Sequence, residues 1–335
     1  MDTAKRNIII ADIGLLLVAL FWGGGFVAGK FGLTILPPLT LTAYRYMGAA
    51  TVMFIFCLRK LRHFRNRKVW LYGLFCGINM FIGNSLQTIG LLYTTAGKQS
   101  FIVSLYILLV PLLSWLVLRK RPANSVIVAA IIGFTGIALI TLTDNFTVGK
   151  GDLLTFALSL TFSAQMIFTA AVVRDIDATV FTFIQLLVVG LLSSVSAVIL
   201  EEPVMPAEIL GMAVPGILGL LYVMTFNSAF AFLLQNISLR FAPANHAAIL
   251  LSLETVFGTI FAVTVAGEVF SMRMIAGCAL MFTAIGIVEI GALRKGCCRG
   301  CAGFRVDFGI GVRFLPACRR VPENLRNTTF LSAIS

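Results

Sequence analysis

Two stretches of the chain, 148 residues apart, decide which fold the sequence can adopt. Residues 87–108 read QTIGLLYTTAGKQSFIVSLYIL, and residues 235–256 read QNISLRFAPANHAAILLSLETV. When the chain is aligned on itself without a gap, three polar pairs coincide: Gln87 with Gln235, Ser104 with Ser252, and Thr135 with Thr283. These coincidences indicate an internal repeat, and a chance similarity between apolar sequences is the alternative.

The composition indicates that the main solvent of this chain is lipid. Of its 335 residues, 59% are hydrophobic and 12% are charged, and the mean hydropathy is +0.98. A soluble domain has about 25% charged residues, and a disordered chain combines few apolar residues with many charges. Both classes are therefore excluded.

The apolar residues fall into ten runs, each close to the roughly 20 residues that a membrane-spanning helix needs. Charged residues and prolines concentrate in the short connections. Barrel strands are a poor alternative, because no run alternates between polar and apolar residues. The runs cover residues 8–29, 38–58, 69–92, 97–118, 124–142, 152–173, 178–200, 211–239, 244–266 and 272–293.

Basic residues are divided unevenly between alternate connections. Lys and Arg accumulate on the cytoplasmic side of membrane proteins. A cytoplasmic N-terminus places the basic clusters at 59–68 and 119–121 inside, and Glu201 and Glu268 outside. The distribution predicts that both termini are cytoplasmic, which requires an even number of spans.

Five spans per copy is an odd number, so the two copies must cross the membrane in opposite orientations. The predicted fold is an all-α integral membrane protein with ten transmembrane helices, arranged as two inverted five-helix repeats at 1–142 and 151–293. Inverted repeats recur in secondary transporters, whose site lies between the copies. The basic, cysteine-containing tail at 294–335 is expected to be cytoplasmic and disordered.

One carboxyl group lies deep in an expected span. Glu254 is about ten residues into its run, which is near mid-membrane at 1.5 Å per residue, and its repeat counterpart is Tyr106. An ionisable residue at that depth is costly and is a functional candidate by default. Glu254 could exchange a proton during transport, or it could be a neutral glutamic acid that pins two helices together.

Amides inside the spans form a second group of candidates. Asn84 and Gln87 share one helical face, since they are three residues apart. Such groups could form interhelical hydrogen bonds, or they could line a cavity for a small zwitterionic or polyhydroxy metabolite. The predicted substrate path is bordered by Trp22, Asn84, Gln87, Lys98, Tyr106, Asn227 and Gln235, with Trp22 stacking on the substrate.

Two cations have two interpretations each. Arg45 either snorkels towards the interface or pairs with an acid or a substrate carboxylate, and Lys98 is either a substrate gate or a solvated helix end.

Glycines and prolines interrupt several of the runs. The glycines at 23–25 permit another backbone to approach closely, and Pro111 and Pro215 are expected to kink their helices. These positions could be hinges of a rocking carrier or ordinary packing features.

Motifs of common enzymes are absent from the sequence. It has no G-x-x-x-x-G-K-[ST], H-E-x-x-H or G-x-S-x-G, and Cys298-Arg-Gly-Cys301 lacks the second ligand pair of a zinc site. We expect no enzymatic activity, no cofactor and no metal. We expect no nucleic-acid partner either, because the basic residues punctuate apolar runs instead of covering a folded face. The expected partners are a lipid bilayer and a small-molecule substrate.

Several motifs together resemble the EamA-type transporters of the drug/metabolite transporter superfamily, over residues 12–292. The last of them departs from the family pattern, since Thr255 stands where the family usually has proline. The motifs are ALFWGGGF at 19–26, LPP at 36–38, AYRY at 43–46, YTTAGK at 93–98, VP at 110–111, LETV at 253–256 and GE at 267–268.

The resemblance implies ten helices, a cavity between two repeats, and export of small amino-acid-like or drug-like metabolites across the bacterial inner membrane, often by proton antiport. It also implies that Glu254 is common to the family and could be structural. A flippase for lipid-linked substrates is the alternative, with only Arg45 and Lys98 available for a phosphate. An intramembrane enzyme is a weaker alternative, because Glu254 has no second acid or base at mid-depth.

Overall fold

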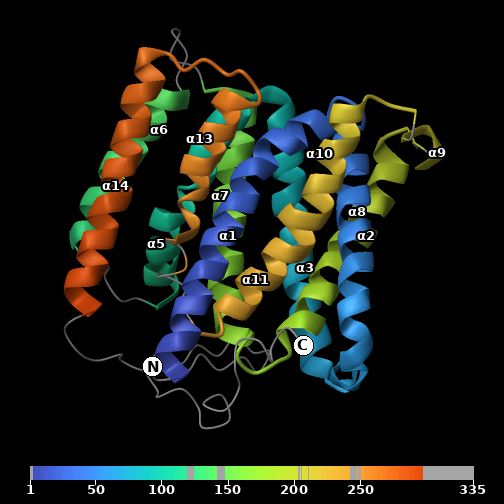
Figure 1. Cartoon of the computed structure of the whole chain (residues 1–335). Helices are drawn as coiled ribbons and strands as arrows, with labels where there is room; N and C mark the ends of the chain where they lie inside the picture. Colours follow the sequence, from blue (N-terminus) through green and yellow to red (C-terminus); the bar gives the residue numbers. More distant parts are fainter. Residues whose placement is uncertain are drawn as a thin grey trace.

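The computed structural model describes residues 3–118, 124–141, 148–202, 204, 206–209, 211–241, 247 and 250–296. These residues form helices and their connections, and no β-strand occurs among them. The long helices stand side by side in one bundle (Figure 1). The described part of the chain is therefore all-helical, as the apolar runs predict.

The order of elements follows the predicted runs. The N-terminal half contains α1 (Thr3–Gly32), α2 (Pro38–Cys57), the 3-10 helix η1 (Leu58–Arg65), α3 (Arg67–Tyr93), α4 (Ala96–Val103), α5 (Tyr106–Leu118) and α6 (Asn124–Thr141). The C-terminal half contains α7 (Lys150–Val172), α8 (Ala178–Leu200), α9 (Pro206–Ile209), α10 (Val214–Met224), the π-helix η2 (Thr225–Phe230), α11 (Ala231–Ser238), α13 (Glu254–Thr264) and α14 (Met272–Gly296). The predicted tail lies outside the described residues from position 297 onward.

Seven helical stretches of the described chain are long and apolar enough to cross a membrane. Three shorter apolar helices fall within the predicted fifth, ninth and tenth runs: Ile127–Gly136, Glu254–Thr264 and Met272–Ala284. The seven long stretches are Ile9–Gly32, Pro38–Arg65, Arg67–Tyr93, Ala96–Leu113, Lys150–Val172, Ala178–Leu200 and Val214–Phe241.

Two helices are interrupted at positions that the repeat alignment equates. Ser104 and Leu105 form a turn between α4 and α5, and Ser252 and Leu253 form a turn directly before α13. The side chains of Ser104 and Thr255 are hydrogen-bonded to each other. The two interruptions therefore meet inside the bundle.

The two halves of the bundle also pack reciprocally. The second and last helices of the halves pair with each other, α2 with α8 and α6 with α14. α3 packs on α7, while α10 and α11 pack on α1. α4 and α5 pack on α7, while α13 packs on α1. The contacts of α3, α4 and α5 with α7 thus have counterparts in the contacts of α10, α11 and α13 with α1, whereas α2–α8 and α6–α14 each join helices of the same rank in the two halves.

The three consecutive glycines of α1 let other elements come close without breaking the helix. A Cβ on Gly23 would lie 2.8 Å from the backbone nitrogen of Gly258 and 2.9 Å from the Glu254 carbonyl oxygen. A Cβ on Gly24 would lie 2.5 Å from the Tyr222 hydroxyl, and one on Gly25 would collide with the Asn227 amide. The predicted close approach is therefore present, and it involves α13, α10 and η2.

The prediction of a kink at Pro215 is wrong. Pro215 lies in the first turn of α10, where its missing N–H would have no helical partner in any case. The irregularity of this segment lies further along the chain, in the π-helix η2 between α10 and α11. Pro111 does lie inside a helix, α5.

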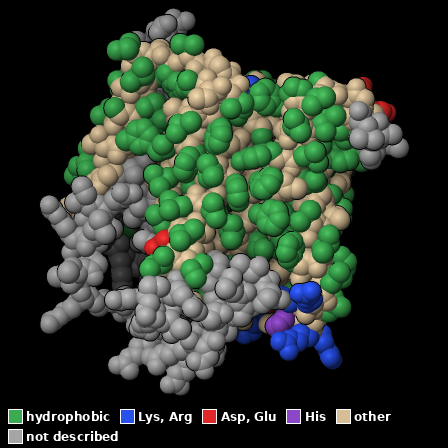
Figure 2. Space-filling view, in the orientation of Figure 1, with side chains coloured by type: hydrophobic (Ala, Val, Ile, Leu, Met, Phe, Trp, Pro, Cys, Tyr) green, Lys and Arg blue, Asp and Glu red, His purple; other side chains and the backbone are tan. Residues whose placement is uncertain are grey.

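The surface is apolar along the helices and charged at the ends. Figure 2 shows hydrophobic side chains over most of the visible helix surface, Lys and Arg at the end where α2 passes into η1, and Asp or Glu near α9 at the opposite end. Exposed apolar faces of this extent are typical of a surface that contacts lipid. The exposed cations near η1 are Arg59, Arg62, Arg65, Arg67 and Lys68.

We expect Gly25→Ala to lower the thermal stability of the detergent-purified protein, because its methyl group would displace the Asn227 side chain. Overpacking of this kind costs about 1–3 kcal/mol. Gly29→Ala is the matched control one turn later, since its Cβ would meet Leu91 at an ordinary 3.4 Å. Equal melting temperatures for the two variants would contradict the close approach.

Candidate functional site

A cavity of about 50 Å³ lies inside the bundle, between helices of both halves. Arg45 of α2 lines it, together with the aromatic rings of Phe26, Phe162 and Phe232. Five residues that the sequence singles out also lie in its wall, contributed by α1, α3, η2 and α13: Trp22, Asn84, Gln87, Asn227 and Glu254.

Trp22 forms part of an aromatic wall. Its indole nitrogen donates a hydrogen bond of 3.2 Å to the backbone carbonyl oxygen of Asn227. Its ring meets Phe162 edge-on, with 5.2 Å between centroids, and lies 5.6 Å from the ring of Phe232. These contacts fix the orientation of the indole beside the cavity, while stacking on a substrate stays a prediction.

Arg45 is buried, so the snorkelling interpretation is wrong. The residue is 8% exposed. Its Nε donates to Ser228 Oγ and its Nη2 donates to Asn227 Oδ1, both at 2.6 Å. Its guanidinium carbon lies 4.8 Å from the centroid of the Tyr46 ring. The π-helical turn of η2 thus presents two consecutive polar side chains to one guanidinium.

Asn84 takes part in a fixed hydrogen-bond network. The Tyr46 hydroxyl donates to Asn84 Oδ1 at 2.6 Å, and Asn84 Nδ2 donates to the Met80 carbonyl at 2.9 Å. Both ends of the amide are therefore satisfied by the protein. Asn84 lines the cavity and, at the same time, joins α2 to α3.

Glu254 and Tyr106, the counterparts in the repeat alignment, each bury a polar atom that has no hydrogen-bond partner in the described part of the chain. These atoms are Glu254 Oε1 and the Tyr106 hydroxyl. Glu254 is 2% exposed and Tyr106 is fully buried. The Tyr106 ring packs on Phe162 at 5.1 Å between centroids, so it lies behind the cavity wall. Unpaired buried polar atoms are rare and call for a functional explanation.

Three predicted path residues lie elsewhere. Lys98 is half-buried near the start of α4, and Gln235 is buried in α11, but neither lines the cavity. Tyr106 does not line it either, although its ring packs on Phe162, which does. His246, the repeat counterpart of Lys98, lies outside the described residues.

A second cavity, of about 20 Å³, adjoins the first. Phe26, Arg45 and Gln87 line both. Holding one water takes roughly 10–15 Å³ of such volume, whereas sites for small molecules measure about 300–1,000 Å³. Neither of these two cavities, as it stands, has the volume of a site for a small molecule.

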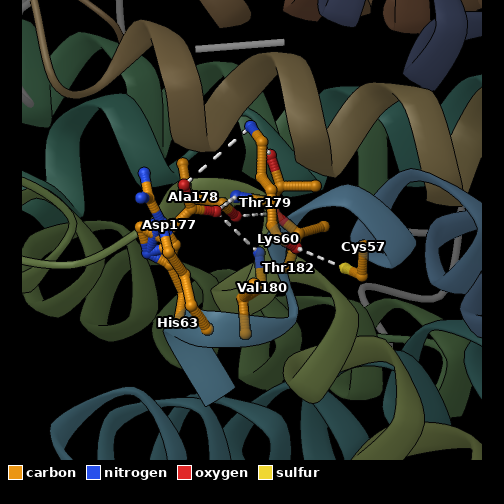
Figure 3. A network of polar contacts seen from close by, with 9 residues as sticks. Cys57, Lys60, His63, Asp177, Ala178, Thr179, Val180 and Thr182 are labelled. Atoms are coloured by element: carbon orange, nitrogen blue, oxygen red, sulfur yellow. Dashed lines mark hydrogen bonds and ion pairs between the residues drawn. The ribbon is translucent and has the colours of Figure 1, made fainter. Parts of the chain in front are cut away.

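At the basic end, the two halves are joined through α8 (Figure 3). Lys60 Nζ lies 3.9 Å from Asp177 Oδ2 and donates to Thr179 Oγ1 at 3.2 Å. Asp177 caps α8 by accepting hydrogen bonds from the backbone nitrogens of Thr179 and Val180. The thiol of Cys57 donates to the Thr179 carbonyl at 3.8 Å.

At the opposite end, two glutamates of the C-terminal half bind helix starts of the N-terminal half. Glu201 accepts hydrogen bonds from the backbone nitrogens of Leu39 and Thr40, at 2.8 and 2.7 Å. Glu268 accepts from the backbone nitrogens of Ala96 and Gly97, at 2.8 and 3.0 Å. A carboxylate is favourable at a helix N-terminus because free N–H groups point towards it.

The sequence prediction of the path omitted Arg45 and Ser228. The sequence shows Arg45 as a cation inside a span. The direction of its side chain depends on its contacts with η2, and no residue pattern predicts this π-helix. Ser228 follows Asn227 in the sequence, and in the π-helical turn η2 both side chains accept hydrogen bonds from Arg45 of α2.

Comparison with known proteins gives consistent matches. The EamA-like transporter family matches residues 9–142 and again residues 149–290. An "Uncharacterized transporter" of Archaeoglobus fulgidus is 32% identical over 288 residues, which cover 84% of this chain and 86% of that protein. The "Uncharacterized transporter YvbV" of Bacillus subtilis is 30% identical over 127 residues, covering 38% of this chain and 42% of that protein. A solved crystal structure has the same fold, with a TM-score of 0.65 at 18% identity, covering 85% of this chain and 98% of that one.

We expect Tyr46→Phe and Tyr106→Phe to differ in stability, although both tyrosines are fully buried. The first substitution removes the donor to Asn84 and should cost about 1–3 kcal/mol, because a buried acceptor loses its partner. The second removes a hydroxyl that has no partner in the described part of the protein, so it should leave the melting temperature unchanged or raise it. Thermal unfolding in detergent measures both, and an equal loss would contradict the assignment of the two hydroxyls.

Proposed function

Because the chain belongs to the EamA-like transporter family, we propose that it is a secondary transporter. It exports small amino-acid-like or drug-like metabolites from the cytoplasm across the bacterial inner membrane, by alternating access coupled to protons. The observation that carries this proposal is the central cavity, in which Arg45, Glu254 and several amides from both halves of the chain converge.

The proposed architecture is ten transmembrane helices in two inverted repeats, 1–142 and 151–293. Two matches to one family in a single chain support it. So does the reciprocal packing of the two halves. The paired interruptions at Ser104 and Ser252 are a third, independent support, because they fall at equivalent positions of the alignment.

The proposed orientation places both termini in the cytoplasm. The exposed cations around η1 are then cytoplasmic, as expected for basic residues near span ends. Glu201 and Glu268 are then on the outer side. The tail from 294 to 335 has no role in this proposal.

Alternating access requires one end to open while the other stays closed. In the proposed cycle, the contact of Lys60 with Asp177 closes the inner end, and the contacts of Glu201 and Glu268 with α2 and α4 close the outer end. Each set joins the N-terminal half to the C-terminal half. A rocking motion could therefore break one set and keep the other.

In this proposal Glu254 is the proton-exchanging group. It lies in the cavity wall, it is buried, and its Oε1 has no hydrogen-bond partner among the described residues. A carboxyl in this position can change its protonation state when the cavity opens to water, since solvation favours the charged form. Binding of the substrate in the cavity and protonation of Glu254 would then influence each other.

We expect Glu254→Gln to uncouple transport from the proton gradient. Proteoliposomes containing the wild-type protein should take up a radiolabelled mixture of amino acids faster when a pH gradient is imposed. In Glu254→Gln this stimulation should disappear, whereas exchange of labelled for unlabelled amino acids should persist, because the amide keeps the shape of the side chain but cannot release a proton.

Glu202→Gln is the matched control, because Glu202 is exposed at the end of the bundle. Unchanged gradient stimulation in Glu254→Gln would refute the coupling role. Absence of uptake and exchange by the wild-type protein would refute transport of amino-acid-like substrates. Movement of a fluorescent lipid between leaflets in the same vesicles would instead favour the flippase.

A further inference from the structure

Arg45 is a buried cation whose counter-charge is absent from the described part of the protein. No carboxylate lies within 4.0 Å of its guanidinium there, and its two side-chain hydrogen-bond partners, Ser228 and Asn227, are neutral. Glu254 lines the same cavity but forms no ion pair with it. A buried charge is normally paired, because leaving water costs it solvation free energy that neutral groups replace only in part.

The guanidinium of Arg45 is held by two hydrogen bonds, and the residue lines a cavity. Its bonds to Ser228 and Asn227 use Nε and Nη2, whereas the group has five N–H donors in all. Arg45 lines both adjoining cavities. Asn227 is held in turn by two contacts with α1. Its side-chain Nδ2 donates to the Phe21 carbonyl at 3.0 Å, and its backbone carbonyl accepts from the Trp22 indole. The cation is therefore oriented before any ligand arrives.

We infer that Arg45 binds the carboxylate of the transported substrate. This inference rests on the proposed function and adds a chemical class to it: a small organic carboxylate with a largely apolar body. A planar guanidinium matches a carboxylate geometrically, with two parallel hydrogen bonds. The apolar body would lie against Trp22, Phe162 and Phe232, which line the same cavity.

A purely structural role for Arg45 makes a different prediction. In that role the guanidinium would only tie α2 to η2, and its replacement would affect stability without changing which ligands bind. The two roles are therefore separated by ligand preference, which a loss of stability alone does not alter.

The test uses the full-length protein in detergent, with Trp22 as the reporter. The chain has three tryptophans, so Trp70→Phe and Trp115→Phe leave Trp22 as the single tryptophan, in the cavity wall. The probes are isovalerate, its neutral isostere isovaleramide, and isopentylamine, titrated at neutral pH. We expect isovalerate to change Trp22 fluorescence at concentrations at least tenfold lower than the other two.

Arg45→Gln should abolish the preference for isovalerate over isovaleramide. Arg174→Gln is the matched control, because this half-buried arginine lies between α7 and α8 and does not line the cavity; it should keep the preference. Size-exclusion chromatography and circular dichroism check that each variant is folded.

Asn227→Asp provides a second test that keeps Arg45 in place. The new carboxylate would stand where Asn227 Oδ1 accepts from the guanidinium, so it should neutralise the cation and weaken isovalerate binding at least tenfold. Equal binding of isovalerate and isovaleramide by the wild-type protein, or no binding of isovalerate, would overturn the inference. A carboxylate preference that survives in folded Arg45→Gln or Asn227→Asp would overturn it too.

These outcomes are separable from failure of the proposed function. An Arg45-dependent carboxylate preference without any uptake or exchange in proteoliposomes would leave the site in place and refute transport of amino-acid-like substrates. Transport that proceeds equally well with carboxylates and with their amides would support the proposed function and refute the role of Arg45.

Discussion

The close approach of α1 to the C-terminal half is the constraint on which the centre of this protein depends. Three consecutive residues without Cβ atoms face three different elements: Gly23 meets α13, Gly24 meets Tyr222, and Gly25 meets Asn227. Side chains at these positions would push the elements apart. Because they are glycines, Trp22 can reach the Asn227 carbonyl, and Glu254 comes to the same cavity. In lipid, where apolar burial gives helices little reason to associate, such backbone proximity is a main source of packing energy.

The π-helix η2 supplies the polar groups that hold Arg45 beside the cavity. Asn227 and Ser228 are consecutive residues of this π-turn, and both accept hydrogen bonds from Arg45. π-Helical turns are rare and often occur at functional sites. Here one holds a cation at the boundary of two cavities, with neutral ligands in place of a carboxylate.

How far the sequence predicts this structure depends on whether a feature is local in the chain or arises from tertiary packing. Apolar runs and the charged residues between them are local signals, so the helical class and the basic end of the bundle follow from them. The polar positions of α3, and Glu254, were found because amides and acids are conspicuous in apolar runs. The repeat alignment also favoured Gln235, as the match of Gln87, and the charge of Lys98 at a span end favoured that residue. Neither lines the cavity, because an alignment or a residue type gives a position but not the direction of a side chain. The π-turn of η2 contacts α1 and α2, and no residue pattern predicts a π-helix at this position, so the direction of Arg45 could not be derived.

The charge of Arg45, which has only neutral partners, suggests how opening and closing of the bundle could depend on the bound substrate. Both ends of the closed cavity are held by a few polar contacts: Lys60 with Asp177 at one end, and Glu201 with the start of α2 at the other. When an end opens, each partner of such a contact can exchange it for hydrogen bonds to water. The centre is different, since Arg45 is out of water in the closed form and has only neutral partners. In the proposed cycle, a bound carboxylate would offset this cost in the closed form alone. Closure over the cargo would then be favoured over closure on an empty cavity, which is the condition that a carrier needs if its conformational change is to depend on what it carries.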